Sequence, residues 1–243
     1  MLQRDQLRTA YAFDERSTPR VRMNFVASID GAVTVDGHSG GLGGESDRAL
    51  MQVLRALSDV VLVGAGTVLA EGYGGVRLRH VDASWRESHG LSAQPRLGVV
   101  SRELSIAAEH PFFADAAVRP LVITCAAAPA EQLAALAGVA EVLVCGDESV
   151  DLAAMLAALA ARGLPQVLCE GGPHVFGALA AAGLVDEVCL TLSPTLIGGD
   201  AGRIVRGAPE MARKMRLVHA ISDDEGFVFL RYAAARPASD PDS

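Results

Sequence analysis

Lysine is almost absent from this chain of 243 residues, and Lys214 is the only one. A mechanism that forms a Schiff base on a lysine therefore has almost no residue to use. Phosphate or carboxylate groups of a ligand would have to be bound by arginine side chains or by backbone N–H groups.

Cations as a whole are also in deficit, with 21 lysines and arginines against 29 acidic residues and a formal net charge of -8. Nucleic-acid binding needs a surface dense in cations, so this balance argues against a nucleic-acid partner. No apolar run approaches the roughly 20 residues of a membrane span. Residues 1–20 lack the apolar core of a signal peptide. We therefore expect a cytoplasmic protein without a membrane segment.

Cysteine is scarce, and its spacing argues against a zinc site. No CxxC pair occurs, and the cysteines lie far apart in apolar, strand-like stretches. They are Cys125, Cys145, Cys169 and Cys189. We expect buried free thiols and no bound metal.

Continuous apolar strands alternate with amphipathic helices along most of the chain. Strands are predicted over 21–28, 59–66, 96–100, 120–124, 140–145 and 166–170, and helices over 46–57, from 129, around 152–159 and from 173. This alternation is typical of an α/β fold with three layers, α/β/α, around a mostly parallel central sheet. Strands over 184–196, 214–222 and 226–234 have no helices between them, which predicts an antiparallel C-terminal edge.

The length suits one large domain, and no linker interrupts the pattern. We expect a polar leader over residues 1–20, a single domain over 21–233 and a disordered tail over 234–243. Asp30-Gly31 followed by AVTV predicts a tight hairpin turn. The stretch GHSGGLGGES, 37–46, predicts a loop over a site, with Ser46 as the N-cap of the next helix.

Ligands of open α/β sheets bind at the carboxyl ends of the strands, which selects three turns. In the first, Gly64 and Gly66 leave the backbone bare and Thr67 offers a hydroxyl, which suits a phosphate or simply a turn. In the second, Ser101 and Arg102 would suit the ribose 2′-phosphate that distinguishes NADP from NAD. The alternative there is an ordinary surface arginine.

The third turn is Glu170-Gly171-Gly172, which follows an apolar strand. The two glycines permit close backbone approach, and Pro173 suits a first helical turn. The carboxylate of Glu170 would either interact with the dipole of its own helix or point at a ligand rich in donors.

Three further residues are candidates. Arg55 lies just off the apolar stripe of its helix, where it would be solvated or would hold an anionic substrate near the loop of Ser39. His38 and His174 flank glycine loops and are possible general acids, although no carboxylate partner is identifiable and a plain surface role is the alternative.

Three stretches together resemble one known family: NFVASIDG, LRALSDVVLVGAGTVLAE and CEGGPHVFGALAAAGLVDEVCLTLSPTLIGG. Over roughly residues 21–232 the chain is similar to the 5-amino-6-(5-phosphoribosylamino)uracil reductases of riboflavin biosynthesis. The resemblance implies a dihydrofolate reductase-like fold and hydride transfer from NADPH to C1′ of a ribosylamino group in its C=N form. It also implies a homodimer through edge strands near the C-terminus, for which the apolar VCLTL and FVFL stretches would form the edge.

The resemblance also assigns site residues. The turns after the strands and the first turns of the following helix would hold the cofactor: Gly64, Gly66, Thr67, Ser101, Arg102, Gly171, Gly172, Pro173, His174, Val175, Phe176 and Gly177. Arg102 would adjoin the 2′-phosphate. The substrate would lie against Asn24, Ser39, Arg55, Arg77 and Glu170, although the alignment slips near Arg77. No catalytic acid or base is implied, because the nicotinamide supplies the hydride.

Two departures from the family keep alternatives open. Many members carry a lysine where this chain has Asn24, which weakens the case for the usual phosphorylated substrate. The HxE and PCxxC motifs of a deaminase domain do not occur, so a stand-alone reductase is expected. The alternatives are reduction of a pterin C=N bond, as in dihydrofolate reduction, and a catalytically silent ligand-binding scaffold.

Overall fold

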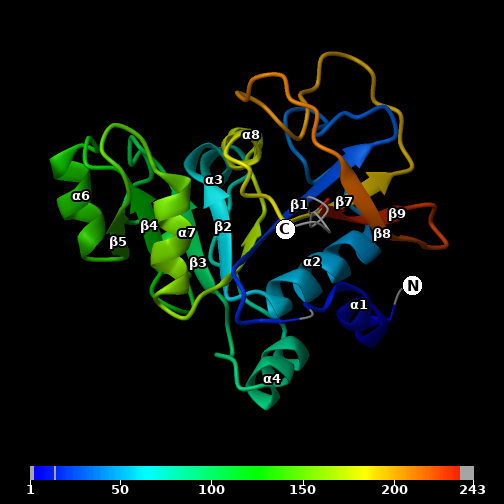
Figure 1. Ribbon diagram of the computed structural model, residues 1–243, viewed down its shortest axis with the longest axis horizontal. Coiled ribbons are helices and arrows are strands. Elements are labelled where there is room, and N and C mark those ends of the chain that lie inside the picture. Colours follow the sequence, from blue (N-terminus) through cyan, green and yellow to red (C-terminus); the bar gives the residue numbers. More distant parts are fainter. Residues whose placement is uncertain (1–2, 14, 236–243) are drawn as a thin grey trace, which may run out of the picture.

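One sheet of nine strands organises the residues that the computed structural model describes, 3–13 and 15–235 (Figure 1). Its strand order is β5-β4-β3-β2-β6-β1-β7-β9-β8. The strands are β1 Arg20–Ser28, β2 Val60–Gly64, β3 Arg96–Val100, β4 Leu121–Thr124, β5 Glu141–Val144, β6 Gln166–Cys169, β7 Glu187–Ser193, β8 Met215–Ser222 and β9 Val228–Ala234. Neighbours from β5 across to β7 pair in parallel, whereas β7, β9 and β8 pair antiparallel. The predicted mostly parallel sheet with an antiparallel C-terminal edge is confirmed.

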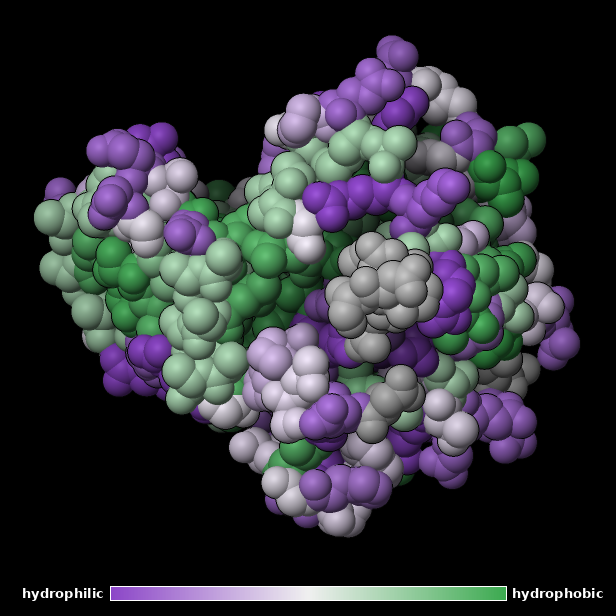
Figure 2. Space-filling view, in the orientation of Figure 1, coloured by the Kyte–Doolittle hydropathy of each residue, from purple (hydrophilic) through white to green (hydrophobic). Residues whose placement is uncertain are grey.

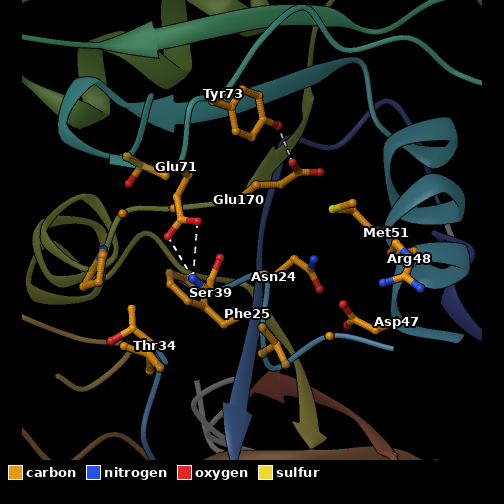
Figure 3. Close-up of a pocket in the computed structure, with 18 residues that line it drawn as sticks. Asn24, Phe25, Thr34, Ser39, Asp47, Arg48, Met51, Glu71, Tyr73 and Glu170 are labelled. Atoms are coloured by element: carbon orange, nitrogen blue, oxygen red, sulfur yellow. Dashed lines mark hydrogen bonds between the residues drawn. The ribbon is translucent and has the colours of Figure 1, made fainter. Parts of the chain in front are cut away.

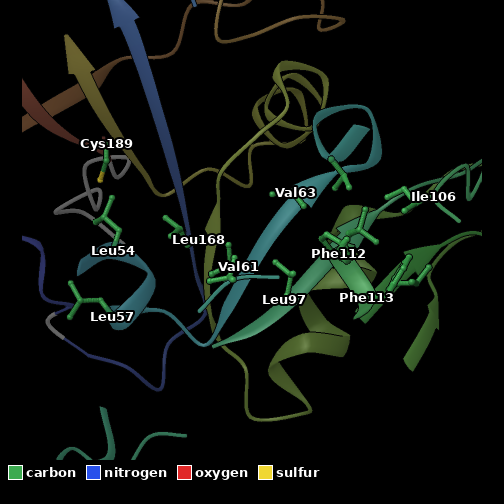
Figure 4. Close-up of a cluster of buried hydrophobic side chains, with 14 of the residues drawn as sticks. Leu54, Leu57, Val61, Val63, Leu97, Ile106, Phe112, Phe113, Leu168 and Cys189 are labelled. Carbon is green, nitrogen blue, oxygen red and sulfur yellow. The ribbon is translucent and has the colours of Figure 1, made fainter. Parts of the chain in front are cut away.

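Helices lie on both faces of this sheet (Figure 1). They are α1 Arg4–Tyr11, α2 Glu45–Leu57, α3 Ala65–Ala70, α4 His80–Ser88, α5 Pro111–Ala114, α6 Ala130–Ala137, α7 Leu152–Ala160 and α8 Pro173–Ala181. Successive side chains of a strand face opposite sides, so Val61 joins one core cluster and Leu62 the other. Leu54 of α2 packs in the first cluster (Figure 4), and Met155 of α7 packs in the second. The predicted three layers are therefore present.

Alanine dominates α6 and α7, which read AEQLAALA and LAAMLAALA. Figure 2 shows the resulting mildly apolar surface over these two helices. Met155 and Leu159 are the buried residues of α7, and neither is accessible to solvent. Full burial of one such side chain stabilises the fold by roughly 1.5–3 kcal/mol.

The N-terminal segment is part of the packed structure, although the sequence suggested only a polar leader. Leu7 and Tyr11 of α1 are 1% and 0% exposed and belong to the first core cluster. Arg231 of β9 donates hydrogen bonds to the backbone carbonyls of Ala10 and Ala12. The apolar positions of this segment are Leu7, Ala10 and Tyr11, which span little more than one helical turn and are too short a pattern to reveal this packing.

Two local predictions about the loop region were wrong. Asp30 and Gly31 form a turn, but the following residues form no hairpin strand, and Val35 makes only an isolated bridge with His38. Strand β1 pairs with β7 as far as Ser28, whereas β6 pairs with β1 only as far as Met23, and the chain after Gly31 leaves the strand as a loop instead of returning along this open side. Ser46 is not the N-cap of α2, because Gly44 holds that position and Ser46 lies in the first turn.

The prediction that VCLTL and FVFL form the edge of the sheet was also wrong. VCLTL lies in β7 and FVFL in β9, and both strands have neighbours on each side, so the edge strand is β8. The predicted tail, 234–243, begins with the last residue of β9, and its residues 236–243 lie outside the described part. In the described ranges, no helix has the length and apolar character needed to cross a bilayer.

The prediction of buried free thiols is confirmed for Cys125, Cys145, Cys169 and Cys189. Burial raises the pKa of the Cys169 thiol to about 12 and that of Cys189 to about 11. Both therefore remain thiols at neutral pH, and they act as small apolar residues of the core.

Candidate active site

Two connected cavities lie at the end of the sheet that is formed by the carboxyl ends of β2, β3 and β6. The first, here called the carboxylate cavity, has a volume of about 410 Å³ and lies between β1, the loop after β1 and α2. The second, the glycine cavity, has a volume of about 520 Å³ and lies between the ends of β2 and β3 and the start of α8. They share Val33, Thr34, Thr67, Glu71, Gly172 and Pro173. The site is thus one space with two compartments.

A buried ion pair closes one wall of the carboxylate cavity. The guanidinium of Arg55 donates two hydrogen bonds of 2.7 Å, one to each carboxylate oxygen of Glu170. The hydroxyl of Tyr73 donates to the same carboxylate and accepts a bond of 3.0 Å from Arg55. Only 11% of the Arg55 side chain and 4% of the Glu170 side chain are exposed. The carboxylate is therefore held in a fixed orientation before any ligand binds.

Electrostatics keep Arg55 charged and Tyr73 neutral. Burial alone would lower the pKa of Arg55, but Glu170 and Tyr73 raise it above its ordinary value. Burial and the charge of Glu170 raise the pKa of Tyr73 well above its ordinary value. Tyr73 therefore acts as a hydrogen-bond donor to Glu170 rather than as an acid.

A second carboxyl group, Asp47, faces the same cavity from the first turn of α2 (Figure 3). Burial raises its pKa, and Glu170 raises it further, against the opposite effect of Thr191 and Arg48. Asn24 of β1 is drawn beside it in Figure 3, and the Oδ1 atom of Asn24 is buried without a hydrogen-bond partner within the described chain. Sequence reasoning missed Asp47, because an acidic residue in a first helical turn is usually explained by the helix dipole.

The glycine-rich loop reaches the site at Ser39. Its backbone N–H donates to the carboxylate of Glu71, at 3.0 and 3.3 Å from the two oxygens (Figure 3). Nδ1 of His38 lies 4.0 Å from the same carboxylate, but 65% of the His38 side chain is exposed. The loop therefore contacts α3 and its C-cap through Glu71, while His38 points to solvent.

Bare backbone lines the glycine cavity at Gly64, Gly66 and Gly172. A Cβ atom on Gly172 would lie 2.3 Å from Oγ1 of Thr67, and one on Gly171 would lie 3.3 Å from its Cγ2. Gly171 has a φ of +134°, which favours glycine. These glycines let the turn after β6 approach the start of α3 closely, so the first turns of α3 and α8 both border the glycine cavity.

The end of β3 forms the far wall of the glycine cavity. Ser101 is buried, and its hydroxyl accepts a hydrogen bond of 2.9 Å from the backbone of Leu104. Arg102 is exposed and lies 3.7 Å from Glu103. His174 and Arg206 line the opposite wall, together with Val175. Arg206 has no counterpart among the sequence-based candidates, because the loop that carries it has no motif.

Three predicted site residues lie elsewhere. Phe176 is buried and stacks on Phe25 at 5.3 Å, so it belongs to the core. Gly177 packs under the loop of Arg206. Arg77 is exposed and lines neither cavity within the described structure. Arg55 contacts the site only through Glu170 and Tyr73, whereas Asn24, Ser39 and Glu170 line the carboxylate cavity directly.

The described residues contain no group of three or more His, Cys, Asp or Glu side chains placed to hold a metal ion.

Comparison with protein families decides which family this architecture belongs to. Residues 19–229 match the model of the RibD C-terminal domain. The chain belongs to the RibD C-terminal domain family. This match confirms the resemblance to the riboflavin biosynthesis reductases that the three sequence stretches indicated.

Two relatives illustrate the family. The chain is 32% identical over 213 residues to the 2,5-diamino-6-ribosylamino-4(3H)-pyrimidinone 5′-phosphate reductase of Archaeoglobus fulgidus, which covers 86% of this chain and 95% of that one. It is also 32% identical to the riboflavin biosynthesis protein RibD of Chlamydia trachomatis, covering 79% of this chain but 50% of that protein.

Solved structures agree on the fold. A pyrimidine reductase-like protein from Corynebacterium diphtheriae superposes with a TM-score of 0.83 and 28% identity over 97% of this chain and all of that one. The riboflavin biosynthesis reductase Rib7 of yeast, at 19% identity, superposes with a TM-score of 0.65. The expected dihydrofolate reductase-like fold of this RibD C-terminal domain is confirmed.

Proposed function

We propose that this RibD C-terminal domain is an NADPH-dependent reductase of a pyrimidine intermediate of riboflavin biosynthesis. The observation that carries the proposal is the junction at Thr67 and Gly172, where a glycine-lined cavity opens into a carboxylate-lined one. A nucleotide and a small heterocycle need this arrangement, because hydride transfer requires the two rings in contact and water excluded.

The glycine cavity fits a dinucleotide. A side chain at Gly172 would fill the turn, and Gly66 has open space around it, so a phosphate reaches backbone N–H groups at both helix starts. Ser101 and Arg102 stand at the next strand end, where a 2′-phosphate would meet a guanidinium. When bound there, the nicotinamide supplies the hydride.

The carboxylate cavity fits a ring that donates hydrogen bonds. Glu170 is fixed by Arg55 and Tyr73, and Asp47 faces the cavity from α2. Both oxygens of Glu170 already accept a bond from Arg55, so adjacent N–H and NH₂ groups of a ring would each be accepted by a different carboxylate, one by Glu170 and one by Asp47. Rings of the 2-amino-4-oxopyrimidine class carry that pair, whereas a uracil presents a carbonyl oxygen in place of the amino group.

The reaction also needs one proton. Reduction of a C=N bond adds a hydride to C1′ and a proton to the nitrogen, which gives the ribitylamino product. That proton is taken from water, and we assign Asp47, which faces the same cavity, to recognition of the ring's N–H and NH₂ groups. Glu170 orients the ring, and Tyr73 keeps Glu170 in place.

The relatives support the substrate class. The Archaeoglobus fulgidus enzyme and a Methanothermobacter thermautotrophicus enzyme, 34% identical over 206 residues, are both named for 2,5-diamino-6-ribosylamino-4(3H)-pyrimidinone 5′-phosphate. That compound carries the adjacent N–H and NH₂ groups that two carboxylates would recognise.

Reduction of a dihydropterin is the second candidate, because a specific observation favours it. Dihydropterins present the same 2-amino-4-oxopyrimidine edge, and Asn24 stands where many family members have a lysine. A silent scaffold remains the alternative of another class.

A substrate panel tests the proposal. Oxidation of NADPH and of NADH is followed with the diaminopyrimidinone phosphate, its uracil counterpart and dihydrofolate, each at matched concentration. We expect the highest kcat/KM with NADPH and the diaminopyrimidinone phosphate. Faster turnover of dihydrofolate would select the second candidate, and no oxidation with any compound would select the silent scaffold.

We also propose a cytoplasmic homodimer. Its supporting feature is β8, the edge strand of the sheet, on which Leu217 and Val218 are 48% and 38% exposed. An exposed apolar edge strand is a surface that a second copy commonly covers.

A further inference from the structure

The loop that follows β7 crosses α8 and is held there by close contacts. The backbone N–H of Arg206 donates to the carbonyl of Pro173 at 3.1 Å. A Cβ atom on Gly177 would lie 2.0 Å from the carbonyl oxygen of Arg206, so helix and loop are in direct contact. Ile204 and Val205 pack against the second core cluster. Residue 206 is therefore anchored through its backbone at the first turn of α8.

The side chain of Arg206 is the part of this loop that is free to bind. It lines the glycine cavity next to Pro173 and His174. Within residues 3–13 and 15–235, its guanidinium has no ion-pair partner. A guanidinium placed beside a glycine-lined cavity without a carboxylate partner suits a phosphate ligand.

The other charged residues that line this cavity belong to segments distant from Arg206 in the sequence. Arg102 and Glu103 belong to the turn after β3, and Glu71 follows α3, where it already binds the backbone of Ser39. Arg206 therefore faces the start of α8, whereas Arg102 faces the end of β3. The two arginines would meet different phosphates of one dinucleotide.

We propose that Arg206 binds the diphosphate of the nicotinamide nucleotide, the group that NADPH and NADH share. The inference rests on the proposed function, because it presumes that the glycine cavity holds this nucleotide. It separates two roles: Arg206 contributes affinity for either nucleotide, and Arg102 contributes the preference for the 2′-phosphate.

Binding titrations test this assignment without any turnover. Dissociation constants for NADPH and for NADH are measured by nicotinamide fluorescence in the wild type, Arg206→Ala, Arg102→Ala and Arg203→Ala. Arg203 is the matched control, because it lies in the same exposed loop but lines a different cavity, beside Ala27 and Gly31.

We expect Arg206→Ala to weaken NADPH and NADH binding by the same factor, about tenfold, which is the loss of one charge-assisted hydrogen bond. Arg102→Ala should weaken NADPH alone, and Arg203→Ala should change neither by more than about twofold. Unchanged binding in Arg206→Ala overturns the inference, and so does a loss confined to NADPH. A wild type that binds neither nucleotide would instead defeat the proposed function itself, and the inference with it.

Discussion

In the buried wall of the carboxylate cavity, Arg55 and Glu170 neutralise each other's charge. Arg55 and Glu170 form a bidentate pair that Tyr73 completes. The sequence placed Glu170 and Arg55 at a site separately but gave no sign that they bind each other, because they are 115 positions apart. Asp47 was missed for a different reason, since its local pattern is that of any helix start.

Glu170→Gln tests whether the Glu170 carboxylate stabilises the buried guanidinium of Arg55. It leaves the buried Arg55 guanidinium without its charge partner, so we expect the free energy of unfolding to fall by about 3–5 kcal/mol. Urea unfolding measures this. Tyr73→Phe is the matched control, because it removes one hydroxyl and should cost about 1 kcal/mol. Equal losses in the two variants would show that the ion pair contributes nothing beyond one hydrogen bond.

Asp47→Asn tests ring recognition. The pKa of Asp47 is raised above its ordinary value of 3.8, so the free site gains the charged acceptor as pH rises through that raised pKa. We expect KM for the diaminopyrimidinone phosphate to fall over this pH range in the wild type and to stay level in Asp47→Asn. The uracil counterpart is the control substrate, and its KM should not fall over this pH range. A wild-type KM that is independent of pH would contradict the role of Asp47.

At the scale of elements, close contacts between backbones shape the site. The turn after β6 approaches α3 because Gly171 and Gly172 have no side chains next to Thr67. Apolar runs and glycine turns predicted these elements well: β2, β3, β6, α2 and α8 lie where the pattern placed them. Helix α4 was missed, because its buried residues include Asp82 and Arg86, which are satisfied by contacts distant in sequence.

Gly172→Ala tests the close contact between Gly172 and Thr67. The added Cβ would lie 2.3 Å from Oγ1 of Thr67, a β-branched residue with a stiff χ1. We expect a loss of stability of about 1–3 kcal/mol, and nucleotide affinity should fall with it.

A double-mutant cycle provides the control for Gly172→Ala. In Thr67→Ala the clashing oxygen is gone, and the next atom, Cβ of residue 67, is 3.7 Å away. Gly172→Ala should then cost less than about 1 kcal/mol in that background. A cost that is the same in both backgrounds would mean that Thr67 is not the source of the clash.

At the scale of the whole molecule, α1 is fastened to the sheet by a buried charge cluster. Glu187 of β7 accepts a hydrogen bond of 2.7 Å from Arg22 of β1 and one of 2.5 Å from Arg231 of β9. Arg231 in turn binds the backbone of Ala10. The alternation of strands and helices predicts the mostly parallel sheet, but this cluster joins residues from both ends of the chain, which local patterns do not relate.

Glu187→Gln tests this cluster. Burial raises the pKa of Glu187, but Arg22 and Arg231 lower it, and the net value is below the ordinary 4.5. Its stabilisation is therefore complete above pH 4.5 and is lost as pH falls through the lower folded-state pKa. We expect Glu187→Gln to lose about 3–5 kcal/mol at pH 7, with a smaller loss in acid. Urea unfolding across pH checks this, and parallel pH profiles of the two proteins would contradict it.

Leu217→Glu tests the homodimer. A charge on the exposed face of β8 would be buried between two copies, so we expect the wild type to elute as a dimer and the variant as a monomer in light-scattering chromatography. Val81→Glu is the matched control, since Val81 is 51% exposed on α4, far from β8 in Figure 1. A monomeric wild type would refute the homodimer.

The central claim, that this site passes a hydride from NADPH to C1′ of a ribosylamino pyrimidine, has one direct test. NADPH deuterated at C4 of the nicotinamide, in each of its two stereochemical forms, is incubated with the protein and the diaminopyrimidinone phosphate, and the product is analysed by mass spectrometry and NMR. We expect one deuterium at C1′ from one of the two forms and none from the other. Product without deuterium from either form, or no reduced product at all, would contradict it.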